Sequence, residues 1–117
     1  MNRKISTGRA GSMTLCVLLW AASGEEAGLA GYEDAVLRLV PRHGGRVLSR
    51  VRRTGDGAAA DRDQAYEVQV IEMPDEAALA AYMADPDRVA LADVHRRVIA
   101  RTQIIRVDQV DTSSLAR

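Results

Sequence analysis

The side chains best suited to acid–base chemistry in this sequence are two histidines. His95 follows Leu91 by one turn and precedes Val98 by three residues, so a helix places it beside an apolar stripe. An imidazole there can point into a cavity and accept a proton near neutral pH. The commoner role at such a border is a hydrogen bond to the backbone. His43 is predicted at a helix end, where an imidazolium is favourable against the helix dipole.

Polar side chains on neighbouring strands offer a second kind of chemistry. Arg50, Glu67 and Gln69 are expected on paired strands and can gather on the sheet face opposite the helices. A guanidinium there can hold a substrate carboxylate or enolate through two parallel hydrogen bonds. The alternative is a salt bridge between subunits that fixes the register of a dimer. Trp20 and Tyr82 supply aromatic surface suited to flat ligands, although core packing is the commoner use of such groups.

The sequence has no strong catalytic signature. It contains no G-x-S-x-G, no Gly-rich phosphate loop and no H-E-x-x-H, and two histidines make no convincing metal set. Cys16 is the single cysteine, which excludes an internal disulfide and a thiolate cluster. We therefore expect neither a metal nor an organic cofactor.

Length and composition restrict the possible classes of protein. The 117 residues suit one domain with a two-layer core, and 47% hydrophobic with 27% charged residues is typical of a soluble globular protein. A formal net charge of zero argues against nucleic-acid binding, because phosphate contacts usually need a basic surplus. The apolar run at 13–22 is too short to cross a bilayer, so we expect no membrane partner and a cytoplasmic location.

That apolar run has two interpretations. Arg3, Lys4 and Arg9 precede it and small residues end it, as in a cleavable secretory leader. The same run also supplies a first strand that the remaining pattern lacks. We favour the strand, because it agrees with the other predicted elements.

The stretch 64–88 predicts a strand followed by a helix, and the rest of the chain repeats this unit. Its alternation predicts one strand face with Tyr66, Val68 and Val70 and an opposite face with Glu67, Gln69 and Ile71. Pro74 ends the strand, and Asp75 suits the N-cap of the helix.

Residues that typically begin or end helices and strands set the boundaries of the other elements. Strands are predicted at 14–21, 46–53, 66–73 and 102–110, with the second helix broken into two pieces at Asp85-Pro86. Ser23 and Glu26 form a capping-box signature for the first helix, and Pro41 with His43-Gly44-Gly45 ends it, because glycine suits the left-handed position after a helix. The domain is therefore expected at 13–110, after a disordered tail at 1–12 and before a polar tail at 111–117. Residues 54–63 are expected to form a long hairpin loop.

The resulting β-α-β-β-α-β order predicts an α+β, ferredoxin-like fold. Right-handed crossovers give an antiparallel four-stranded sheet of order 4-1-3-2 with helices on one face. The uncovered face is expected to carry Leu48, Ile71 and much of the first strand, which is too apolar to remain in water. Pairing of two such faces predicts a homodimer.

Three segments resemble the dimeric α/β-barrel superfamily: HGGRVLSRV at 43–51, VIEMPDEAALAAYMADPDR at 70–88 and HRRVIARTQIIRV at 95–107. The likeness is greatest to small DUF1330-like members of unknown function, with the antibiotic biosynthesis monooxygenase group as a neighbour. It implies a homodimer whose two sheets pack face to face. The matching positions would be Gly44, Gly45, Glu72, Pro74, Asp75, Tyr82 and Arg97. The chain departs from the family at Met73, where a Phe is frequent.

Two functions stay open at this point. The first is a cofactor-independent enzyme of monooxygenase, isomerase or cyclase type, acting on a small organic substrate of a biosynthetic pathway. In that case His95 is the base, Arg50 holds an anion, and Trp20 and Tyr82 line the pocket, with Glu67 and Gln69 nearby. The second is a non-catalytic ligand-binding or accessory dimer that uses the same cavity.

Overall fold

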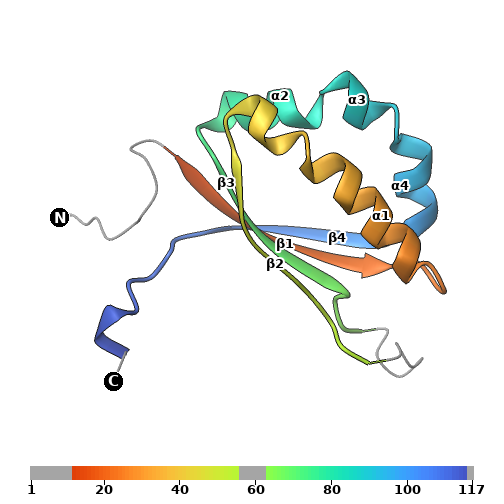
Figure 1. Cartoon of the computed structure of the whole chain (residues 1–117), viewed down its shortest axis with the longest axis horizontal. Coiled ribbons are helices and arrows are strands. Elements are labelled where there is room, and N and C mark those ends of the chain that lie inside the picture. The colour runs from red at the N-terminus through yellow and green to blue at the C-terminus, as the bar shows by residue number, and fades with distance from the viewer. Residues whose placement is uncertain (1–11, 56–62, 116–117) are drawn as a thin grey trace.

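β1 and β3 lie in the middle of a four-stranded sheet, and alternate side chains of both strands are buried against the helices. β1 spans Met13–Ala21 and β3 spans Glu67–Met73, between the edge strands β2 (Arg46–Arg52) and β4 (Ile99–Val107). The order is β2-β3-β1-β4, with every neighbouring pair antiparallel (Figure 1). The structure, a computed structural model, describes residues 12–55 and 63–115. The predicted ferredoxin-like topology is confirmed, and residues 13–21 form a central strand as expected.

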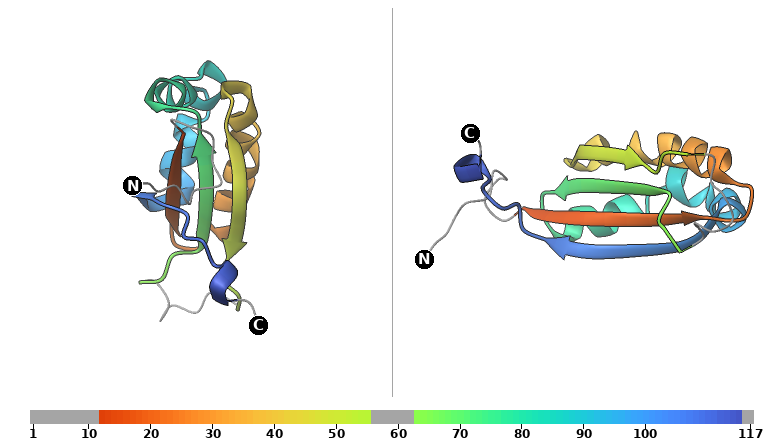
Figure 2. Two further views of the ribbon diagram at one scale, coloured as in Figure 1. Left: turned by 90° about the vertical axis from the view of Figure 1, so that its left-hand side faces the viewer. Right: turned by 90° about the horizontal axis from the view of Figure 1, so that it is seen from below.

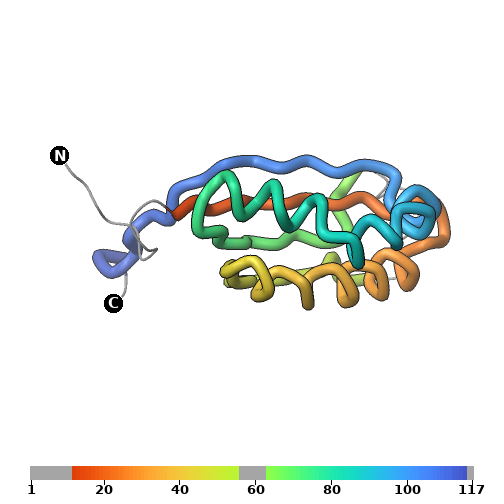
Figure 3. Tube along the Cα trace, turned by 90° about the horizontal axis from the view of Figure 1, so that it is seen from above, coloured from red at the N-terminus to blue at the C-terminus, as the bar shows by residue number. Residues whose placement is uncertain are grey.

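The helices cover one face of the sheet only (Figure 2). α1 spans Glu26–Leu37 and ends in a 3-10 turn at Val40–His43, while α2 (Glu76–Met83), α3 (Pro86–Val89) and α4 (Ala92–Val98) connect β3 to β4. Seen from the helix side, α1 forms one row and α2 to α4 form a second row along the sheet (Figure 3). The second crossover thus has three helical pieces, where the sequence predicted two.

Three local predictions can be compared with the backbone. Asp75 caps α2 by accepting a 2.8 Å hydrogen bond from the Ala78 N–H, as predicted. A left-handed glycine was predicted in the Gly44-Gly45 pair, and Gly44 adopts it, with φ of 82°. The capping box at Ser23 is wrong, since α1 begins at Glu26 after Glu25 with no side-chain cap. Gly24, at φ of 75°, inserts a turn between the serine and the helix.

The alternation of β3 was predicted correctly, but its two faces were assigned to the wrong layers. Ile71 pairs with Leu15 in the core under the helices, where both are buried. Glu67 and Gln69 share that face, so the expected cluster opposite the helices does not exist. Leu48 lies at an irregularity in the register between Val47 and Ser49.

The uncovered face carries a different set of apolar side chains. By strand register, Cys16 faces Val70 and Ile105, and Leu18 faces Val68. These side chains form one contiguous patch across the two central strands and β4. The sequence prediction of an apolar open face therefore holds, with other residues than Ile71 in it.

The core lies between this sheet and the helices. Its buried apolar side chains are Met13, Leu15, Val17, Leu19, Leu29, Tyr32, Val36, Leu37, Val40, Ile71, Met73, Tyr82, Val98 and Ile99. Within the described residues, no helix combines the length and the apolar character that crossing a membrane requires. The predicted tail at 1–12 and loop at 54–63 lie largely outside the described residues, and 113–115 of the predicted polar tail form an exposed 3-10 turn.

Candidate functional site

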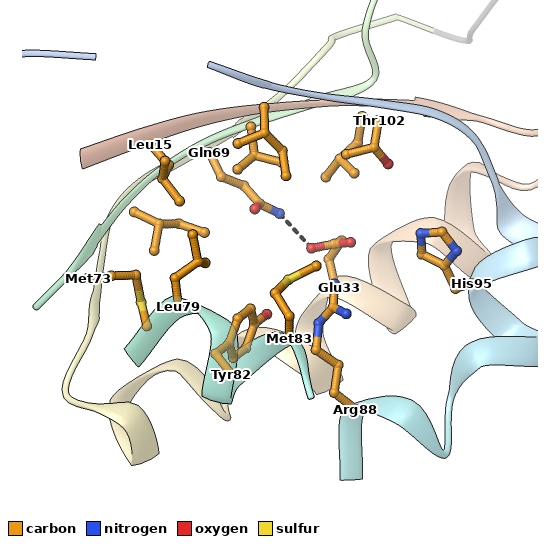
Figure 4. A pocket seen from close by; sticks show the side chains of 14 residues that line it. Leu15, Glu33, Gln69, Met73, Leu79, Tyr82, Met83, Arg88, His95 and Thr102 are labelled. Carbon is orange, nitrogen blue, oxygen red and sulfur yellow. Dashed lines mark hydrogen bonds between the residues drawn. The ribbon is translucent and has the colours of Figure 1, made fainter. Parts of the chain in front are cut away.

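A cavity of about 440 Å³ lies between the helices and the covered face of the sheet (Figure 4). This volume is in the ordinary range for small-molecule sites, about 300–1,000 Å³. Apolar side chains make up most of the wall: Leu15, Val17, Leu19, Ile71, Met73, Leu79, Met83 and Ile104. The polar lining consists of Glu33, Gln69, Tyr82, Arg88, His95 and Thr102. Met83 and Ile104 are 41% and 51% exposed, which places the mouth between α2 and β4.

Buried polar side chains form a hydrogen-bonded chain on the floor of the cavity. Gln69 Nε2 donates to Glu33 Oε1 at 2.8 Å and to Glu67 Oε2 at 2.7 Å. Glu67 also accepts from Arg50 Nε at 2.7 Å and from Arg52 Nε at 2.8 Å. Both N–H groups of the Gln69 amide are thereby used, which fixes its orientation.

The two carboxyl groups at the ends of this chain have opposite pKa shifts. Burial raises the pKa of Glu33, and the hydrogen bond from Gln69 opposes that rise only in part. Burial also acts to raise the pKa of Glu67, but the hydrogen bonds from Arg50, Arg52 and Gln69 outweigh it and leave the pKa below its usual value. The network therefore favours the ionised form of Glu67, whereas burial in the mainly apolar wall favours the neutral form of Glu33.

Arg88 reaches the same region from α3. Asp85 caps this short helix by accepting from the Asp87 N–H at 2.9 Å, and Asp85 is held by Arg42 at 3.0 Å and by His43 at 2.8 Å. The Arg88 guanidinium lies over the Tyr82 ring, with Cζ 5.1 Å from its centroid. Its Nε is buried and has no hydrogen-bond partner within the described part of the chain. Figure 4 shows the guanidinium pointing toward Glu33.

His95 and Tyr82 complete the polar end of the cavity. The His95 ring meets the Tyr32 ring edge to face, with centroids 5.4 Å apart. Burial and the nearby charge of Arg88 lower the pKa of His95, so its imidazole is neutral at physiological pH. The Tyr82 hydroxyl donates to the Val36 carbonyl at 3.3 Å, and burial raises the pKa of this phenol.

Three of the six predicted site residues line the cavity: His95, Tyr82 and Gln69. Arg50 does not, because its Nε donates to Glu67 and its Nη1 pairs with Asp34 at 2.7 Å. The predicted alternative for Arg50 was a salt bridge between subunits, whereas these ion pairs lie within one chain. Glu67 is fully buried beneath the same network.

Trp20 lies away from the cavity, on the other side of the sheet. It pairs with Arg101 in the β1–β4 register, and the Arg101 guanidinium stacks on its ring at 4.2 Å. Trp20 Nε1 donates to the Asp63 carbonyl at 3.2 Å. The sheet therefore separates Trp20 from Tyr82, and the two cannot line one pocket in a single chain.

Glu33 and Arg88 were missed by sequence reasoning. Glu33 lies next to Tyr32 on the buried stripe of α1. A carboxyl is unusual in such a stripe, and this departure from the apolar pattern is visible in the sequence. Arg88 follows the capped turn at Asp85-Pro86 by two residues, but nothing in the sequence shows that this turn faces the sheet. Within the described residues no group of three or more His, Cys, Asp or Glu side chains is arranged to hold a metal ion.

Comparison with solved structures supports the fold assignment. A dimeric protein of unknown function with a ferredoxin-like fold from Bacteroides fragilis has 11% identity and a TM-score of 0.61, over 85% of this chain and 97% of that chain. A dabb family protein with a ferredoxin-like fold from Mesorhizobium loti has 18% identity and a TM-score of 0.57, over 86% and 99%. A protein from Bacteroides thetaiotaomicron described as a "putative antibiotic biosynthesis monooxygenase" has 18% identity and a TM-score of 0.63, over 89% and 94%.

These identities are low enough that the comparison establishes the fold alone. No protein-family model matches the chain. No curated protein matches it at a significant level either.

Proposed function

We propose that this chain is a homodimeric, DUF1330-like member of the dimeric α/β-barrel superfamily whose cavity binds a small, mainly apolar organic molecule. One observation carries the proposal: a cavity of about 440 Å³ with apolar walls has its acid–base groups gathered at one end. Glu33 and His95 both have pKa values displaced by burial, which is typical of functional sites. We further propose that the protein is a cofactor-independent enzyme.

The proposed chemistry begins with removal of a proton from the substrate. The neutral imidazole of His95 accepts the proton, and the electron pair left behind is delocalised into a carbonyl as an enolate. Isomerisation, cyclisation and cofactor-independent oxygenation of an acidic organic substrate share this step. Tyr82 and the aliphatic wall position the apolar body of the substrate.

The homodimer is proposed from the open face of the sheet. Cys16, Leu18, Val68, Val70 and Ile105 form an apolar patch that no helix of the described chain covers. A second copy buries the same patch through two-fold pairing. The structure from Bacteroides fragilis, which is described as dimeric and ferredoxin-like, supports the proposal of a dimer.

A non-catalytic ligand-binding dimer is the second candidate, and the surroundings of His95 favour it. Within the described residues, no side chain is hydrogen-bonded to the His95 ring, so nothing fixes its tautomer or orientation in the way that catalytic bases usually require. The cavity and the apolar patch serve this function equally well.

The experiment uses a panel of small aromatic and alicyclic carbonyl compounds. Ligand-induced shifts in melting temperature are measured for the wild type, for Leu79→Trp, which fills the cavity from α2, and for Ala81→Trp, an exposed control on the same helix. We expect shifts in the wild type and the control but not in Leu79→Trp. Equal shifts in all three proteins would place binding elsewhere.

Turnover then separates the two candidates. Compounds that bind are incubated with wild type, His95→Ala and Arg96→Ala, and products are followed by mass spectrometry. An enzyme loses product formation only in His95→Ala, because the Arg96 side chain on the same helix is 69% exposed and does not line the cavity. Binding without product in any of the three proteins assigns the non-catalytic function.

A further inference from the structure

Arg88 is the cationic side chain of the cavity wall. Within the described residues no carboxylate is close enough to form an ion pair with it, although Glu33 interacts with its charge through space. A guanidinium that is partly withdrawn from water is stabilised by a bound anion. Its Nε is buried without a hydrogen-bond partner, and its contact with the Tyr82 ring leaves that donor unused. The guanidinium therefore carries a donor that no described residue uses, beside a mainly apolar cavity.

Among the described residues, the polar groups of the wall form no ion pair with Arg88. Figure 4 shows the Glu33 carboxyl facing Arg88, but this carboxyl accepts a hydrogen bond from Gln69 at 2.8 Å. Burial raises the pKa of Glu33 and the charge of Arg88 acts against that rise, so the two groups interact only through space. Arg50, by contrast, is saturated by Glu67 and Asp34 and competes for no ligand.

We propose that Arg88 recognises an anionic oxygen of the ligand, so that the cavity selects compact organic acids with an aromatic or alicyclic body. This inference rests on the proposed function, namely that the cavity binds small molecules. The carboxylate, or an enolate of the same charge, accepts from the Arg88 guanidinium and neutralises its charge. The ring of the ligand lies along the aliphatic wall formed by β1, β3 and α2, with Tyr82 at the boundary.

The test compares three probes of nearly equal shape: 2-naphthoate, the neutral 2-naphthamide and the cationic 2-naphthylmethylamine. Dissociation constants are measured by calorimetry for the wild type, Arg88→Leu and Arg96→Leu. Arg96 also lies in the α2–α4 crossover, but its side chain is 69% exposed, so its loss controls for overall charge. We expect the wild type and Arg96→Leu to bind 2-naphthoate about 10- to 100-fold tighter than 2-naphthamide, the range of a charge-assisted hydrogen bond.

In Arg88→Leu the preference for the acid is expected to disappear while 2-naphthamide still binds. Arg88→Gln gives the same comparison if the leucine variant does not fold. Retained preference for 2-naphthoate in either variant overturns the inference. Equal binding of acid and amide by the wild type also overturns it, while leaving the cavity as a binding site. Failure of the wild type to bind any of the three probes counts against the proposed function itself.

Discussion

The distance between α1 and α4 is set where Gly28 meets Val98, and this contact positions the site. α1 carries Glu33 and α4 carries His95, so a change in helix separation moves the two groups apart. A Cβ added to Gly28 would lie 2.7 Å from Val98 Cγ1 and 2.8 Å from Glu25 Oε1. The glutamate end can move at little cost, but Val98 is buried, with 1% exposed surface.

Gly31, on the same helix, provides a matched control. A Cβ added there meets nothing within 4 Å, so Gly31→Ala changes helix propensity alone. Alanine is favoured over glycine inside a helix by about 1 kcal/mol, which raises the melting temperature by about 4 °C in a domain of this size. Gly28→Ala has the same gain, opposed by an overpacking cost of about 1–3 kcal/mol, and is expected to lose about 1 kcal/mol net.

Urea unfolding followed by circular dichroism measures the free energy of unfolding of Gly28→Ala and Gly31→Ala. Both variants gain the same helix propensity, so the difference between the two free energies gives the packing cost at the α1–α4 contact. Val98→Ala is expected to destabilise the protein by about 2 kcal/mol alone, and the double variant with Gly28→Ala by less than the sum of the two. Equal stabilisation by Gly28→Ala and Gly31→Ala, or simple additivity in the double variant, would refute the close contact.

Other perturbations test the network, the open face and the capped turn. Glu67→Gln is expected to destabilise the protein by about 2 kcal/mol at pH 7, since its arginine partners are half-exposed, and Glu76→Gln, an exposed control, by under about 0.5 kcal/mol. The pKa of Glu67 is lower in the folded protein than in the unfolded chain. Its contribution to the free energy of unfolding is therefore present above the unfolded pKa and is lost as pH falls through the folded pKa. Urea unfolding measured at a series of decreasing pH values detects this loss. Val70→Glu is expected to give a monomer by light scattering, whereas Val89→Glu, on exposed α3 surface, leaves the dimer intact. Asp85→Asn is expected to weaken 2-naphthoate binding through Arg88, unlike Asp75→Asn, which affects only the cap of α2.

The strand order followed from the sequence because its signals were local and consistent. Pro74 and Asp75 ended β3 and capped α2, and the two most apolar strands took the central places. The α4–β4 boundary was placed three residues late, since Val98 passes directly into Ile99 with no glycine or proline between them. The break after Val89 was missed for the same reason.

The candidate site was only partly predictable, because alternation defines two faces but not which one the helices cover. Glu67 and Gln69 are polar, and polarity on one strand face usually indicates solvent. Here Arg50 and Arg52 on β2 and Glu33 on α1 satisfy them beneath the helices. These hydrogen bonds join residues that are 15 to 36 positions apart in the chain, and no local sequence pattern specifies such pairs. His95 was found because it borders a helical stripe, whereas Arg88 lies in a four-residue helix too short to show one.

The pH dependence of acid binding follows from the groups that face Arg88. These are Glu33, His95, Tyr32 and Tyr82; burial raises the pKa of both tyrosines, so they stay neutral throughout. As pH rises through the raised pKa of Glu33, its new negative charge opposes a ligand anion at Arg88. As pH falls through the lowered pKa of His95, an added positive charge favours that anion.

Affinity for 2-naphthoate is therefore expected to decrease as pH increases, across a window that begins above the ordinary pKa of a glutamic acid. Glu33→Gln keeps an amide oxygen to accept from Gln69 but cannot ionise, so the Glu33 part of the slope is expected to be lost and only the His95 part to remain. Glu26→Gln, in the first turn of the same helix and outside the cavity lining, is expected to keep the wild-type slope. Calorimetry at several pH values decides the matter: a slope as steep in Glu33→Gln as in the wild type assigns the effect to another group and removes Glu33 from the anion site.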